Sequence, residues 1–247
     1  MVFSFSSQKG GSGKTVSTLT ICAALRRSGL KTMLIDCDQQ GNLTQSLIAG
    51  ETTRKGTYDI LQRRASIEQA AVESPLGPLV AADARIATMD NKTAVGAFRS
   101  AVEAGRAHYD AILIDTPPAL GIVTIAALAA SDFVVIPQRP DAFGLIALRQ
   151  IAAVITSLQT SNPSLTAGLI ITQANTRSIS NQAGIKALCG AAESYGYKVF
   201  LPPVRASVAV QEAHWQRGMT VLDTRSGAAQ DYAEIADQIR RIIQKGE

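Results

Sequence analysis

The residues best suited to chemistry lie in a glycine-rich run near the N-terminus, residues 9–15, which reads Lys-Gly-Gly-Ser-Gly-Lys-Thr. An apolar stretch, residues 2–5, precedes the run, and a helix-patterned segment, residues 16–27, follows it. Strand, glycine loop and helix form the setting of a phosphate-binding loop. The glycines permit backbone angles that side chains forbid, so backbone amides and the positive end of the helix can cradle anionic oxygens.

Two side chains of this loop have specific expected roles. Lys14 is placed to reach the β- and γ-phosphates of a nucleotide, and the hydroxyl of Thr15 is placed to hold Mg²⁺. Gln8 stands where the usual pattern has its first glycine. The other loop residues that we expect to contact the nucleotide are Lys9, Gly10, Gly11, Ser12, Gly13 and Val16.

The second lysine, Lys9, makes this loop similar to the deviant Walker A motif of the ParA/MinD family of P-loop ATPases. In that family the extra lysine crosses a dimer interface and touches the nucleotide of the other subunit. The resemblance implies ATP and Mg²⁺ as ligands, slow partner-stimulated ATP hydrolysis, and a homodimer that forms with ATP. The physical reason is that a positive charge from the second subunit neutralises phosphate charge only when two ATP-bound subunits meet.

A second segment, residues 31–37, has the pattern of a buried parallel strand that ends in aspartate and continues into Asp38. It resembles switch I of the family, in which the second aspartate, here Asp38, positions the attacking water. A carboxylate within hydrogen-bond reach of that water can orient it or accept its proton. Asp36 is expected to help near the metal. Taken alone, either aspartate could equally cap the end of the strand.

A third segment, residues 110–115, is an apolar strand that also ends in aspartate. This is the Walker B arrangement, in which Asp115 holds Mg²⁺ through a water because Mg²⁺ dehydrates reluctantly. Residues 116–118, Thr-Pro-Pro, resemble switch II, the loop that senses the γ-phosphate. Such a strand alone is common, but the order and spacing of the three segments point to one site.

The remaining pattern alternates strand and helix, which predicts one α/β domain over residues 1–247 with a doubly wound, mostly parallel sheet and helices on both faces. Residues 51–56 are predicted to form a polar loop, followed by a short helix near residues 58–61. The predicted strands are 2–7, 31–36, 78–82, 110–115, 132–137, 166–172 and 197–201; the predicted helices are near 14–28, 41–48, 91–105, 121–130, 143–160, 180–194, 207–217 and 227–244.

Composition narrows the functional classes. The net charge is +4. The chain has three cysteines, an odd number, and their spacing is not that of metal ligands. They indicate reduced thiols in a cytoplasmic protein. The N-terminus leads directly into a strand, so no signal peptide is expected. No apolar run reaches the roughly 18–20 residues of a membrane span, which predicts no stable membrane insertion.

The loop after the strand at residues 166–172 corresponds to the loop that holds the adenine base in the resembling family. Thr172 stands where the family usually has asparagine, and Asn175 lies close by. Direct base contact by these residues and an ordinary polar loop remain equally open.

Residues 205–235 resemble the C-terminal region of the small ParA proteins, which have no helix-turn-helix extension. In those proteins, basic side chains of this region bind DNA without sequence preference once the ATP dimer forms. A single arginine more often only solvates a surface, but several together can bind phosphates and release counterions. The DNA-binding candidates are Arg205, Arg217, Arg225, Arg240, Arg241 and Lys245.

The resemblance therefore implies a nucleoid-associated partition ATPase that positions plasmid, chromosomal or protein cargo with a cargo-binding partner. A MinD-like membrane-positioning ATPase is one alternative, since Ile235, Ile239 and Ile242 form an apolar stripe on the last predicted helix. Packing of that stripe on the sheet is the expected outcome. An ATP-binding accessory or scaffold protein in DNA transfer is a second alternative. A ligase similar to dethiobiotin synthetase is a third, but it would have no use for Lys9.

Overall fold

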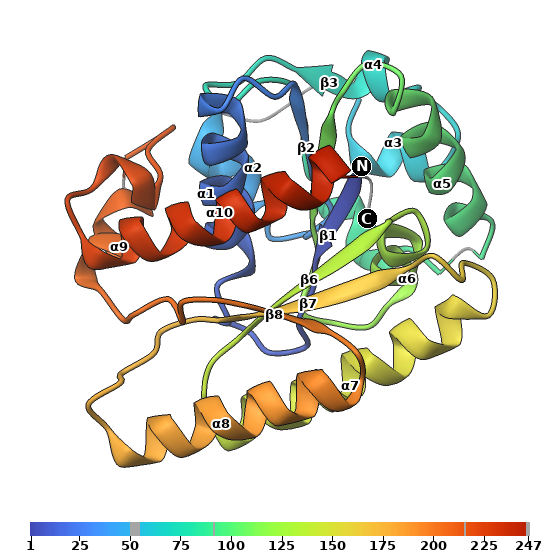
Figure 1. Cartoon of the computed structure of the whole chain (residues 1–247). Coiled ribbons are helices and arrows are strands. Elements are labelled where there is room, and N and C mark those ends of the chain that lie inside the picture. The colour runs from blue at the N-terminus through green and yellow to red at the C-terminus, as the bar shows by residue number, and fades with distance from the viewer. Residues whose placement is uncertain (50–54, 91, 215, 246–247) are drawn as a thin grey trace.

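The computed structural model describes residues 1–49, 55–90, 92–214 and 216–245. Its centre is an eight-stranded sheet in the order β3-β4-β2-β5-β1-β6-β7-β8 (Figure 1). Every strand pair is parallel except β3 with β4, which confirms the predicted mostly parallel sheet. The strands are β1 (Val2–Phe5), β2 (Thr32–Asp36), β3 (Ala71–Val72), β4 (Leu79–Val80), β5 (Ala111–Asp115), β6 (Phe133–Gln138), β7 (Thr166–Ile171) and β8 (Lys198–Phe200).

The register of the central strands brings the predicted site to one edge of the sheet. β1 lies between β5 and β6, with Phe5 opposite Asp115. On the other side of β5, Asp36 is also opposite Asp115. Because the loops after β1, β2 and β5 leave the same edge, the glycine-rich loop and both acidic strand ends lie next to one another.

Helices cover both faces of the sheet, as predicted. α1 and α10 pack on one face, and α5, α6, α7 and α8 pack on the other. The helices are α1 (Lys14–Arg27), α2 (Asn42–Leu47), α3 (Thr57–Leu61), α4 (Ile67–Ala70), α5 (Thr93–Gly105), α6 (Ile122–Ala129), α7 (Ala142–Gln159), α8 (Ile179–Ser194), α9 (Val208–His214) and α10 (Gly227–Lys245), with 3₁₀ turns at Ala84–Thr88 and Val221–Asp223.

Two short elements, β3 and α4, were not predicted, because pieces of two and four residues carry too little periodicity to recognise. The short helix near residues 58–61 is confirmed as α3. Most of the predicted polar loop, residues 51–56, lies outside the described residues.

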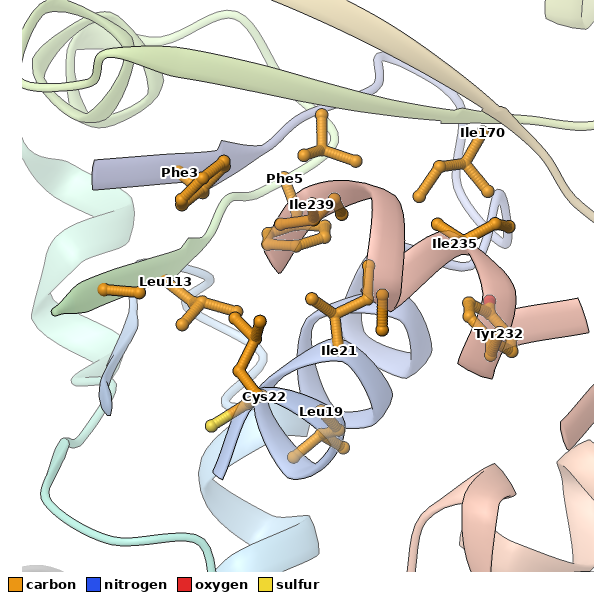
Figure 2. Packing of buried hydrophobic residues seen from close by; sticks show 14 of the residues in the cluster. Phe3, Phe5, Leu19, Ile21, Cys22, Leu113, Ile170, Tyr232, Ile235 and Ile239 are labelled. Atoms are coloured by element: carbon orange, nitrogen blue, oxygen red, sulfur yellow. The ribbon is translucent and has the colours of Figure 1, made fainter. Parts of the chain in front are cut away.

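The core between α1, α10 and the sheet contains the apolar stripe of the last helix. Ile235 and Ile239 are buried in the same hydrophobic cluster as Phe3 and Phe5 of β1 (Figure 2). The prediction that this stripe packs on the sheet is therefore confirmed. In the same core the Tyr232 hydroxyl is 2.9 Å from the Ser17 hydroxyl, which joins α10 to the helix that follows the glycine-rich loop.

One expectation about apolar segments needs correction. Among the described residues, α7 has the length and composition of a membrane-spanning helix, with a mean hydropathy of 1.4 over its 18 residues. Core helices meet the same criterion. Leu148, Ile151 and Ala152 of α7 are buried in the cluster that also contains residues of β6, β7 and α8, which accounts for the apolar character of its inner face.

Candidate functional site

The glycine-rich loop is shaped to receive anionic oxygens. Gly11 and Gly13 adopt φ angles of +69° and +93°, which favour glycine. A Cβ atom added at Gly10 or Gly11 would meet nothing within 4 Å, so space is open at that part of the loop. α1 starts directly after Gly13 without a side-chain cap, and this leaves amides of its first turn available for an anion.

Thr15 and Asp115 meet behind this loop in an arrangement that suits Mg²⁺. The Thr15 hydroxyl donates a hydrogen bond to Asp115 Oδ2 at 2.6 Å. Asp115 is fully buried, and its Oδ1 has no partner among the described residues. Burial, with the nearby Asp36, raises the pKa of Asp115 to about 8. A buried carboxylate with a free oxygen beside a hydroxyl fits a hydrated Mg²⁺, which would also favour the ionised carboxylate.

Asp36 supports the loop that follows β2. Its Oδ1 accepts a hydrogen bond from the Asp38 amide at 3.1 Å, and its Oδ2 accepts bonds from the amide and hydroxyl of Thr44 at 2.8 and 2.7 Å. Burial raises the pKa of Asp36 to about 6. Both oxygens of Asp36 thus accept hydrogen bonds from the segment that contains Asp38 and Thr44.

Lys14 and Asp38 complete the buried charges at this edge. They are 7% and 5% exposed, so water screens them little. Burial lowers the pKa of Lys14, while the negative charges of Asp115 and Asp38 act in the opposite direction. Asp38 Oδ1 accepts a hydrogen bond from the Gln40 amide, which leaves its other oxygen for a further donor. The structure therefore brings Lys14, Asp38 and Asp115 together, as the sequence predicted.

Lys9 makes its contacts at the start of α7. Its Nζ donates to Asp141 Oδ1 at 2.7 Å and lies 5.6 Å from the centre of the Phe143 ring. Asp141 also caps α7 by accepting a hydrogen bond from the Gly144 amide. The sequence did not identify Asp141, because an aspartate before a helix signals only a cap. The Lys9 side chain is therefore held by an ion pair within its own chain.

A cavity of about 530 Å³ adjoins the loop. One side is formed by Gly11, Gly13, Val16 and Thr172, and the other by residues after β8 and by Tyr232. The Thr172 hydroxyl is used in a hydrogen bond to the Ser12 carbonyl at 2.7 Å. The cavity lies where a nucleoside would continue from phosphates in the loop.

The second residue predicted near the base, Asn175, does not line this cavity. It is exposed, and its Oδ1 accepts a hydrogen bond from the Arg177 amide. The wall formed by the residues after β8 was not predicted, because the sequence resemblance of this region suggested DNA binding and its residues reach the loop only through folding.

The predicted DNA-binding residues are spread over the C-terminal part of the chain. Arg205 forms a salt bridge with Asp231, and Arg240 and Arg241 both pair with Asp237. Arg217 and Arg225 are exposed. Lys245 ends α10 and is the last described residue. The structure thus does not gather all six into one cluster within a single chain.

Comparison with known proteins gives a consistent result. Residues 1–167 match a family model described as an AAA domain. The chain is 32% identical to the chromosome partitioning protein ParA of Caulobacter vibrioides, over 96% of this chain and 93% of that protein. It is 30% identical to the sporulation initiation inhibitor protein Soj of Bacillus subtilis, over 96% of this chain and 97% of that protein.

Solved structures share the fold. Cobyrinic acid a,c-diamide synthase from Mycobacterium smegmatis with bound ADP and magnesium matches with a TM-score of 0.82 and 26% identity, over 100% of this chain and 96% of that one. A putative plasmid partition protein from Borrelia burgdorferi bound to AMPPNP matches with a TM-score of 0.83 and 19% identity, over 97% and 98%. With the glycine-rich loop, Lys9 and the two acidic strand ends in place, these matches lead to one conclusion: the chain belongs to the ParA/MinD family of P-loop ATPases.

Proposed function

We propose that the whole chain, residues 1–247, acts as one partition ATPase domain that forms a homodimer with ATP and Mg²⁺, binds DNA without sequence preference, and is released by hydrolysis. The observation that carries this proposal is the presence of the signature lysine, Lys9, at the sheet edge that also holds Lys14, Asp38 and Asp115. The similarity to a chromosome partitioning protein supports a role in partition.

Each residue of the site then has a task. The loop amides and Lys14 bind the phosphates, and Thr15 and Asp115 hold Mg²⁺. Mg²⁺ held there would neutralise negative charge on the phosphates. Asp38 orients the attacking water or takes up its proton. Asp36 keeps the loop of Asp38 in place through its bonds to the Asp38 and Thr44 amides.

The cavity beside the loop accommodates the adenosine. It adjoins Gly11 and Gly13, the two loop glycines with positive φ, and Val16 contributes an apolar surface. Because the Thr172 hydroxyl is already bonded to Ser12, Thr172 contacts the nucleoside through its methyl group. This assignment keeps Thr172 in the nucleotide site and leaves Asn175 at its periphery.

DNA binding requires the dimer in this account. The phosphate-binding candidates of one chain are too scattered for a strong site, and two chains would double their number. Arg217 and Arg225 are both exposed and therefore accessible to DNA phosphates. Hydrolysis, stimulated by a partner on the cargo, would separate the chains and release them from the nucleoid.

The first test is the oligomeric state. We expect sedimentation velocity to show a monomer without nucleotide or with ADP·Mg²⁺, and a dimer with ATP·Mg²⁺ or a nonhydrolysable analogue. The dimer is expected to disappear when EDTA removes Mg²⁺, because Thr15 and Asp115 would hold the ion that neutralises the phosphates. A monomer in every nucleotide state would refute the sandwich dimer.

Two further measurements on the same purified protein distinguish the alternative functions. A membrane-positioning ATPase predicts ATP-dependent co-sedimentation with anionic liposomes, whereas the stripe of Ile235 and Ile239 is already buried on the sheet. A scaffold that uses ATP structurally predicts a dimer with no turnover of ATP. Phosphate release measured alongside sedimentation therefore distinguishes the scaffold from the ATPase.

A further inference from the structure

The wall of the cavity opposite the glycine-rich loop is held in place by backbone hydrogen bonds. It begins with residues 204–206, which run beside the loop that follows β7. The Val204 amide donates to the Ile171 carbonyl at 2.8 Å, and the Ala206 amide donates to the Ala174 carbonyl at 2.9 Å. These backbone bonds place residues 204–206 next to the end of β7 and the loop that follows it. The side chain of Arg205 makes a further connection, to α10.

Arg205, at the centre of this wall, is fastened to α10 by a buried carboxylate. Its backbone amide donates to Asp231 Oδ2 at 3.0 Å, its Nε donates to the same oxygen at 2.8 Å, and its Nη2 donates to Oδ1 at 2.6 Å. Asp231 is 1% exposed. All the hydrogen bonds that the described residues give to this carboxylate come from Arg205. Bidentate arginine–carboxylate pairs are both strong and geometrically specific.

The start of α10 is shaped around this pair. A Cβ atom added at Gly227 would lie 2.6 Å from Arg205 Nη1 and 2.8 Å from its Cδ, so glycine leaves the room that the arginine occupies. Tyr232, the residue after Asp231, lines the cavity and is bonded to Ser17 of α1. One turn of α10 therefore braces both sides of the cavity, the wall through Asp231 and the loop helix through Tyr232.

We propose that Arg205 is a positioning residue for the nucleoside: its pair with Asp231 holds residues 204–208 against the adenosine. The inference rests on the proposed nucleotide binding at this cavity. Removing one partner would leave a buried polar group without its hydrogen bonds and would free the wall from α10. The phosphates, held by the loop amides and Lys14, would be bound as before.

The proposal predicts that variants of this pair lose affinity for ATP but keep their affinity for a ligand without a nucleoside. Conservative variants, Arg205→Lys and Asp231→Asn, are expected to weaken ATP binding on the order of tenfold. Binding of inorganic tripolyphosphate, which has no nucleoside, is expected to stay within about twofold. The double variant is expected to bind ATP no more weakly than the weaker single variant, because both changes break the same pair.

These affinities are measured by displacing a fluorescent ATP analogue with ATP or with tripolyphosphate, using circular dichroism to confirm the fold of each variant. The matched control is Arg27→Lys, because the Arg27 side chain is 53% exposed against 55% for Arg205 and pairs with Asp223 outside the cavity. That control is expected to bind both ligands as the wild type does.

Unchanged ATP affinity in Arg205→Lys and Asp231→Asn would overturn the proposal, and so would an equal loss for ATP and tripolyphosphate, which would indicate a general disturbance of the fold. A wild-type chain that binds neither ligand would refute the proposed function itself, and the positioning role with it. If Arg205 instead serves only as a DNA contact, Asp231→Asn will keep full ATP affinity, because it leaves the arginine charge intact.

Discussion

Replacing Asp38 by alanine is expected to lower the rate of ATP hydrolysis by on the order of 10²–10³-fold while ATP binding and the ATP dimer persist. Asp38 is 5% exposed and lies close enough to Lys14 to affect its pKa, so it faces the phosphate end of the site. Because Asp38 is not proposed to bind the metal, its replacement is expected to leave nucleotide binding intact. Single-turnover phosphate release and the lifetime of the dimer measure the two effects.

The matched control for Asp38 is the next residue, Gln39, which is exposed on the same loop. Gln39→Ala is expected to turn over ATP within about twofold of the wild type. Asp38→Asn keeps the size of the side chain but removes its charge, and it should be nearly as slow as the alanine variant if the carboxylate accepts a proton. Normal turnover in Asp38→Ala would contradict the assigned role of this residue.

Replacing Lys9 by alanine is expected to abolish the ATP dimer at concentrations at which the wild type is fully dimeric, a loss on the order of 100-fold or more in dimer affinity. The reason is that Lys9 is proposed to contact phosphate across the interface, where a desolvated charge is worth most. Within one chain it pairs with Asp141 instead. ATP binding to the monomer is expected to be largely unchanged, because Lys14 and the loop amides remain.

Sedimentation velocity with ATP·Mg²⁺ and titration with a fluorescent ATP analogue test these two statements about Lys9. Lys31→Ala serves as the control with the same change in net charge. Lys31 is exposed directly before β2, at the opposite edge of the sheet from the site. A dimer of wild-type strength in Lys9→Ala would refute contact of this lysine with the second subunit's nucleotide.

The fold was largely predictable because its strands are buried on both faces. Continuously apolar runs such as residues 133–136 and 169–171 predict such strands, and their alternation with helices predicts the parallel sheet. The two-residue strand β3 could not be predicted, since it exists only through its pairing with β4. The expectation that no segment is long and apolar enough to span a membrane was also wrong for α7. Its 18 residues contain a single charged side chain, Arg149, so their mean hydropathy stays high.

The parts of the candidate site that lie within short sequence motifs could be predicted. The loop around Lys14 and the strand end at Asp115 carry their own motifs, and the sheet register brings them together. Contacts that join distant segments left no such signal. Lys9 and Asp141 are 132 positions apart, and the bonds of Arg205 to Asp231 span 26 positions. The sequence therefore indicated Arg205 only as a DNA-binding candidate and gave no sign of its pairing with the buried Asp231.

The central claim is that ATP switches this chain into a form that binds DNA. It is tested most directly by measuring binding to random-sequence DNA with ATP·Mg²⁺, with ADP·Mg²⁺ and without nucleotide, each across a series of salt concentrations. The account predicts binding only with ATP·Mg²⁺, and it predicts that the affinity falls steeply as salt rises, because phosphate contacts release counterions. Absence of DNA binding in every nucleotide state, or equal binding in all three, would contradict it.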